Sequence, residues 1–259
     1  MKHQQILVKL AAPFLVRALD EDLARWVGWQ MLRSPEESRA DTDVVRPILA
    51  RWRCLLDADD TAPDTRHRGW VALAVLLHRY GLTDEAVTAH ALTSIDALNR
   101  DVVLSDAFAR QSPTIKRFLT TPPSALTRRP RRPSALTLLR PGDVISIQVA
   151  AKFYTAFVRQ VAASRAYPVI EFYSGSFDRP PTLGQLSGRP AALDRGHARF
   201  GVVGLNYLPD PANQVLAVAA QHQQPPLGNE PEPGEGLYTM TDIIRLQRDI
   251  TRLSATSTA

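Results

Sequence analysis

The stretch LLRPGDVISIQV, residues 138–149, marks a change in the character of this chain. Before it, apolar residues recur every three to four positions, which is the spacing of amphipathic helices. From Val144 onward, short runs rich in Val, Ile, Phe and Tyr are bounded by Gly, Pro, Asp and Asn, which is typical of strands. Pro141, Gly142 and Asp143 supply a turn before the first run. The sequence therefore predicts an α+β protein with helices first and a sheet afterwards.

Residues 1–120 are predicted to form a bundle of four or five helices joined by short loops. Helical spacing covers residues 4–33, where Pro13 bends or divides the run, and then 43–56, 66–80, a helix from 83 onward, and 105–119. The stretch WVALAVLL, residues 70–77, is apolar nearly all round. A helix that is apolar on every side is buried, so we expect this one at the centre of the bundle.

Residues 121–136, TPPSALTRRPRRPSAL, contain four prolines and four arginines and little to bury. Such a composition favours an extended connector. The four arginines Arg128, Arg129, Arg131 and Arg132 form a basic arm, which we interpret as a solvated linker or as a segment that pairs with carboxylates on a protein partner.

Residues 137–259 are predicted to form a small antiparallel β-barrel or sandwich followed by a C-terminal helix. The expected strands start at 144 and then cover 152–162, 167–175, 198–207 and 213–221, and the helix covers 241–253. A long loop, residues 176–196, separates the third and fourth strands. Long loops often carry function, so this loop is a candidate site.

The charge distribution argues against a nucleic-acid-binding face. The net charge is +5, but residues 1–119 carry 16 basic and 16 acidic residues, and residues 137–259 carry 11 and 10. The excess lies in the arginine arm, whereas nucleic-acid-binding folds spread cations over a face. The lone Cys54 and the lack of an apolar run of about 18 residues favour a cytoplasmic protein with no membrane span and no disulfide.

No pattern typical of catalysis or metal binding occurs in the sequence. The six histidines form no H-x-x-x-H or H-E-x-x-H pair, and neither a P-loop nor a dinucleotide fingerprint is present. We therefore expect a non-enzymatic protein without cofactor or metal. Aromatic and arginine side chains anchor protein interfaces, so the predicted partner-binding residues are Tyr154, Tyr173, Phe177, Arg179 and Arg189. The helical region remains an alternative contact surface.

Three strand segments, GDVISIQV at 142–149, YTAFVRQV at 154–161 and VIEFYSG at 169–175, resemble the small-barrel immunity proteins of bacterial polymorphic-toxin systems. Gly142, Asp143 and Val144 fit the start of the first family strand, and Tyr154 fits the second, while Ile145 stands where the family has an aromatic residue. The resemblance implies an inhibitor that blocks a cognate toxin by direct binding and performs no chemistry.

Two alternatives stay open. RPGDV at 140–144 and GRPAAL at 188–193 are similar to elements of endoribonuclease toxins that are small barrels, although 47 residues separate Gly142 from Arg189. The arginine arm by itself is compatible with a nucleic-acid-binding adaptor, whose affinity would fall steeply with salt.

Overall fold

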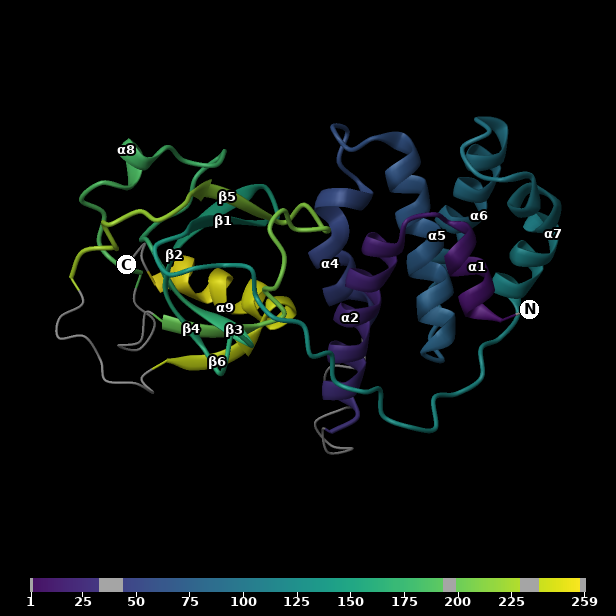
Figure 1. Ribbon diagram of the computed structural model, residues 1–259, viewed down its shortest axis with the longest axis horizontal. Helices are drawn as coiled ribbons and strands as arrows, with labels where there is room; N and C mark the ends of the chain where they lie inside the picture. Colours follow the sequence, from purple (N-terminus) through teal and green to yellow (C-terminus); the bar gives the residue numbers. More distant parts are fainter. Residues whose placement is uncertain (1, 33–43, 193–198, 229–237, 257–259) are drawn as a thin grey trace. The chain divides into compact units, whose positions relative to one another are not determined.

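The computed structural model describes residues 2–32, 44–192, 199–228 and 238–256, which contain eight helices and six strands (Figure 1). The chain divides into two compact units, Met1–Pro133 and Ser134–Ala259, called here the N-terminal unit and the C-terminal unit. The described part of the first unit is helical, and all described strands belong to the second. The α+β class predicted from the sequence is confirmed.

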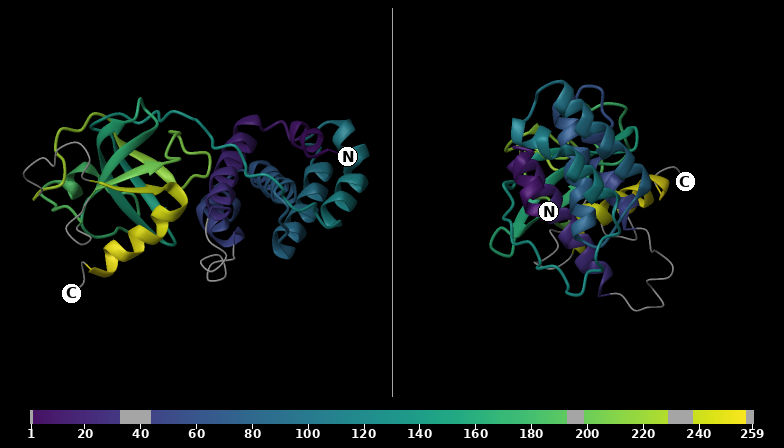
Figure 2. Two further views of the ribbon diagram at one scale, coloured as in Figure 1. Left: turned by 90° about the horizontal axis from the view of Figure 1, so that it is seen from below. Right: turned by 90° about the vertical axis from the view of Figure 1, so that its right-hand side faces the viewer.

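The N-terminal unit is built around one central helix, α5. Its described helices are α1 His3–Lys9, α2 Pro13–Gln30, α4 Val45–Leu56, α5 Pro63–Arg79, α6 Glu85–Arg100 and α7 Asp106–Thr120. Every residue from Val71 to Leu77 is buried, and α5 contacts each of the other five helices (Figures 1 and 2). The prediction of a central helix from its all-round apolar sequence is confirmed.

Two prolines begin helices in this unit rather than interrupt them. Pro13 is the first residue of α2 and Pro63 is the first residue of α5. The first position of a helix needs no N–H donor, so proline is tolerated there. Pro13 thus separates α1 from α2, and the third predicted helix begins three residues earlier than its spacing indicated.

Residues 121–133 of the proline-rich connector belong to the N-terminal unit and lie against its helices. The connector contains no helix or strand, and its backbone at residues 124–126 lies directly against Gly81. A Cβ atom at Gly81 would come within 2.9 Å of the Leu126 nitrogen, and its φ of +74° also favours glycine. Arg129 Nε donates a hydrogen bond to the Gly28 carbonyl at 2.9 Å. These contacts hold the connector against the helices.

The C-terminal unit is a six-stranded sheet in the order β5-β1-β2-β3-β4-β6. The strands are β1 Val144–Val149, β2 Lys152–Ala162, β3 Tyr167–Phe172, β4 Arg199–Val203, β5 Val215–Ala219 and β6 Thr239–Asp242. All neighbours are antiparallel except β4 and β6, which are parallel. The prediction of an antiparallel barrel or sandwich is therefore wrong: the six described strands form one open, mixed sheet with β5 and β6 at its edges.

The turn before β1 explains why the sheet begins at Val144. Gly142 has φ of +88°, a conformation that glycine adopts without strain. The buried Asp143 carboxylate accepts hydrogen bonds from the Arg140 N–H at 2.8 Å and from the Gln221 N–H at 3.4 Å. The Gly-Asp pair therefore ties the start of β1 to the segment that follows β5.

Cross-strand pairing divides the sheet into two faces. Ile145, Ala156 and Phe172 are aligned on one face, and Val144, Phe157, Glu171 and Arg199 are aligned on the other. Helix α9, Ile243–Thr256, contacts β1, β4 and β6 and places Ile250 beside Phe172. We call the Phe172 side the helix face. The other side, the loop face, is partly covered by residues 173–192, which include the short helix α8 Leu183–Leu186.

Candidate functional site

The 173–192 loop is fixed to the sheet through its own small apolar cluster. Tyr173 and Leu186 pack with Val144 and Phe157 of the loop face, and Phe177 packs against this group. Phe177 also exchanges two backbone hydrogen bonds with Phe153 of β2, at 2.8 and 2.9 Å. The loop thus has a defined conformation on the sheet, which preorganises the side chains that it presents to solvent.

Arg189, near the end of this loop, forms hydrogen bonds with the backbone at its start and in α8. Its Nε donates to the Gln185 carbonyl at 2.8 Å and its Nη1 donates to the Ser174 carbonyl at 3.0 Å. The guanidinium carbon lies 4.5 Å from the centre of the Phe177 ring, within the range of a cation–π interaction. This geometry gives Arg189 a structural role in the loop.

The structure brings the five predicted partner-binding residues to one region but gives them different surroundings. Phe177 and Arg189 are half-buried and in contact, and Arg179 is exposed beside them in the chain. Tyr173 is only 2% exposed, and its hydroxyl donates to the Gln224 carbonyl at 2.9 Å. Burial raises the pKa of this phenol to about 12. Tyr154 lies toward the helix face, where it lines a small pocket with Phe172.

Charged and apolar side chains surround the Phe177–Arg189 pair. Lys152 and Asp178 form an exposed ion pair at 2.6 Å, whose hydrogen bond raises the pKa of the lysine and lowers that of the aspartate. Leu183 of α8 is 38% exposed, and Leu227, which pairs with the loop backbone at Ala191, is 56% exposed. The loop therefore presents aromatic, cationic and aliphatic groups together, the mixture found in protein interfaces.

A buried ionic group that the sequence analysis did not identify lies on the same face. Glu171 of β3 is fully buried, and its carboxylate contacts the guanidinium groups of Arg159 and Arg199. Arg199 is the cross-strand partner of Glu171, and a bulge in β2 brings Arg159 to the same carboxylate. The sequence held one signal for this group, the single acidic residue inside the apolar strand YPVIEF. A charge buried in such a strand needs oppositely charged partners, which here come from the neighbouring strands.

The four arginines of the basic arm are exposed in the structure. Arg129 is also the residue that binds the Gly28 carbonyl, so it anchors the arm. Arg128, Arg131 and Arg132 follow the same extended backbone and present their charge to solvent. A role of this arm in partner binding stays a prediction.

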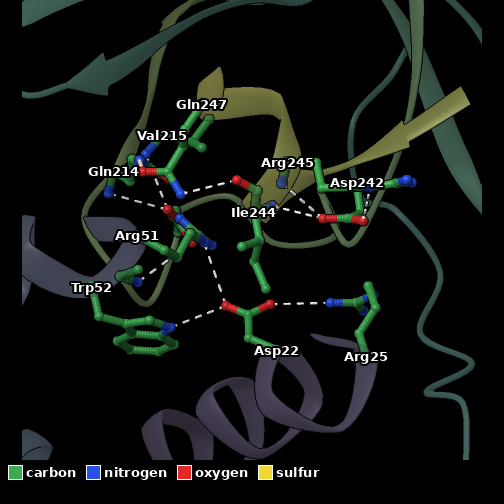
Figure 3. Close-up of polar contacts among 12 residues, drawn as sticks. Asp22, Arg25, Arg51, Trp52, Gln214, Val215, Asp242, Ile244, Arg245 and Gln247 are labelled. Carbon is green, nitrogen blue, oxygen red and sulfur yellow. Dashed lines mark hydrogen bonds and ion pairs between the residues drawn. The ribbon is translucent and has the colours of Figure 1, made fainter. Parts of the chain in front are cut away.

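The polar cluster centred on Asp22 in the N-terminal unit links two helices (Figure 3). The buried Asp22 carboxylate accepts hydrogen bonds from Trp52 Nε1 and Arg25 Nη1, both at 3.0 Å, and lies 3.4 Å from Arg51 Nε. The donors come from α2 and α4, so the cluster fastens these helices to each other. Its geometry suits structural stabilisation.

A small pocket lies in the described part of the C-terminal unit. It is lined by Tyr154, Phe172, Tyr173, Gly175, Ala192, Ile250 and Leu253 and has a volume of about 10 Å³, space for about one water molecule. In the described ranges no three His, Cys, Asp or Glu side chains lie close enough to hold a metal ion. Among the described helices, none combines the length and apolar content that crossing a membrane requires.

Comparisons of the chain with protein-family models, with curated proteins and with solved structures found no match. The resemblance to immunity proteins therefore stays a prediction.

Proposed function

We propose that this chain is a non-catalytic binding protein that neutralises a bacterial toxin by direct contact through its 173–192 loop. The observation that supports this proposal is the preorganised pair of Phe177 and Arg189 beside the exposed Arg179. Arginine and aromatic side chains supply most of the binding energy in many protein interfaces. A cognate toxin is the class of partner that the resemblance over residues 142–175 implies.

The fixed conformation of the loop is suited to binding. Two backbone hydrogen bonds between Phe177 and Phe153 and two from the Arg189 guanidinium hold the loop before any partner arrives. A surface that is already ordered loses less conformational entropy on association than a disordered one. Phe177 and Arg179 can therefore contribute their contact energy to affinity with a small ordering cost.

The proposal is tested by capture and growth rescue. The chain is used to isolate interacting proteins from its native host, and the toxic protein among them is co-expressed with the chain. We expect the wild-type chain to restore growth and Arg179→Glu combined with Phe177→Ala to abolish the rescue. Arg248→Glu is the matched control, because Arg248 is exposed on α9 and lies outside the loop. Equal rescue by all three chains would contradict the site, and absence of any neutralised toxin would contradict the function.

A further inference from the structure

Three side chains on the loop face form a charge group that is not electrically balanced. Glu171 of β3 stands opposite Arg199 of β4, and Arg159 approaches from the bulge of β2. Counted over these three described residues, the group contains two positive charges and one negative charge. The side chains are 0% exposed for Glu171, 16% for Arg159 and 11% for Arg199. A net positive charge with so little solvent is costly unless a further anion compensates it.

The two arginines do not share the carboxylate equally. Arg159 directs both Nε and Nη2 at Oε2 of Glu171, and these are close contacts. Arg199 reaches Oε1 only through Nε, at 3.3 Å. Both carboxylate oxygens are therefore occupied, and Arg199 retains hydrogen-bonding capacity that Glu171 does not use.

The unused donor is Nη2 of Arg199. This atom is buried, and no hydrogen-bond partner for it lies among the residues that the structure describes. Leaving a buried donor unpaired costs free energy, more so for a charged group, and native proteins usually satisfy such atoms with protein, water or a bound ion. Within the described part of the chain, an acceptor is thus missing at one defined atom, next to an excess positive charge.

We infer that Arg159 and Arg199 form a binding site for one oxyanion, a carboxylate or a phosphate group. An oxyanion supplies both the negative charge and the acceptor atom that the group lacks. The planar guanidinium of arginine is the donor best matched to these anions. A free anion and an acidic side chain of a protein partner share this chemistry. The site is a property of the chain alone and holds whether or not the partner is a toxin.

The test measures oxyanion binding by the full chain at constant ionic strength. Sodium phosphate and sodium acetate each replace sodium chloride, and melting temperature and calorimetric heat at 25 °C are recorded. We expect a saturable response to at least one of the two anions. Preference for acetate would indicate an acidic side chain as the natural ligand, and preference for phosphate would indicate a phosphate group.

Variants separate this site from general salt effects, since phosphate also stabilises proteins without binding to them. Arg199→Gln is expected to lose the saturable response, whereas Arg248→Gln, which removes one exposed charge from α9, keeps it. Glu171→Gln is expected to bind about tenfold more tightly, because it removes the competing negative charge and keeps a hydrogen-bonding side chain.

If Arg199→Gln does not fold, Arg199→Lys replaces it. Lysine keeps the charge but lacks the planar fork, so we expect the affinity to fall about tenfold. The inference is overturned if melting follows ionic strength alone, or if the Arg199 variants respond like the wild type. An unchanged or weaker affinity in Glu171→Gln would also contradict it.

Discussion

The two faces of the sheet in the C-terminal unit are made by the same strands and have different properties. On the helix face, Ile145, Ala156 and Phe172 are buried and apolar, and α9 adds Ile250 to them. On the loop face, the aligned residues change from Val144 and Phe157 to Glu171 and Arg199 across four strands. One face thus resembles an ordinary core, and the other combines a small core with charge.

This difference shows how one sheet can keep an apolar face and a charged face apart. Successive residues of a strand point to opposite faces, so apolar and functional groups can alternate without mixing. Burial of apolar surface on the helix face stabilises the unit. We propose that the loop face, which carries the charged group and the 173–192 loop, is the face that binds.

Replacing a large side chain on the helix face should have the largest effect on stability. Phe172 is 2% exposed and packs edge-to-face on Phe200. We expect Phe172→Ala to lower the free energy of unfolding by about 4 kcal/mol, because it removes apolar burial and leaves a cavity. Phe177→Ala on the loop face is the comparison, with an expected loss below about 1.5 kcal/mol for a half-buried ring. Equal losses in urea unfolding would contradict the division between the faces.

Glu171→Ala should have the next largest effect. It leaves two buried guanidinium groups without their carboxylate, which typically costs about 3 kcal/mol. Glu171→Gln should cost clearly less, because the amide oxygen still accepts a hydrogen bond. Urea unfolding of both variants measures the difference. If the alanine variant were as stable as the wild type, the ionic group would not be an integral part of the loop face.

The sequence was sufficient to predict those elements whose apolar pattern is local. The central helix α5 follows from the uninterrupted apolar run that contains Val71 and Leu77, and β1 follows from the turn at Gly142. In both cases the deciding residues are neighbours in the chain. Their burial or their turn geometry needs no information about distant segments.

Features that depend on pairing between distant segments were missed. Strand β6 consists of Thr239–Asp242, which is short and polar, and it becomes a strand only because β4 lies beside it. Strand β6 is an edge of the sheet and runs parallel to β4, which an antiparallel barrel does not contain. The prediction of a barrel was therefore wrong. The group of Arg159, Glu171 and Arg199 depends on the register of three strands and on a bulge, neither of which the sequence pattern shows.

Substitution of Arg189 should loosen the 173–192 loop more than it destabilises the unit. Arg189→Ala removes two hydrogen bonds to backbone carbonyls and the contact with Phe177. We expect a loss of about 1–2 kcal/mol in unfolding and faster hydrogen exchange confined to the loop. Arg179→Ala is the matched control and should change neither quantity, since Arg179 is exposed. Unaltered exchange in Arg189→Ala would show that the apolar cluster alone fixes the loop.

The smallest expected effect is a pH dependence of stability in the N-terminal unit. It comes from a pair of histidines, His3 and His78, whereas the loop face of the C-terminal unit carries ion pairs. His78 Nε2 donates to the Thr121 carbonyl at 3.1 Å, so its Nδ1 accepts from His3 Nε2 at 2.9 Å. Burial, and then the electrostatic influence of the neighbouring His78 and Arg79 side chains, lower the pKa of His3 from its usual 6.5. The unfolded chain therefore binds this proton more readily than the folded chain does.

The stability contribution of His3 is consequently complete above pH 6.5 and is lost as the pH falls toward the lowered pKa of the folded state. Urea unfolding between pH 5 and pH 7.5 should show less stability at the acidic end. His3→Gln should reduce this slope, whereas Lys9→Gln, on the same helix, should not. A slope identical in His3→Gln and the wild type would mean that other groups set the pH dependence.

Hydrogen exchange of the chain, free and bound to its proposed toxin partner, tests most directly whether the loop face is the binding face. We expect protection on complex formation in residues 173–192 and in β2 beside them, with little change in α9. Protection confined to Met1–Pro133, with the 173–192 loop exchanging as in the free chain, would contradict it.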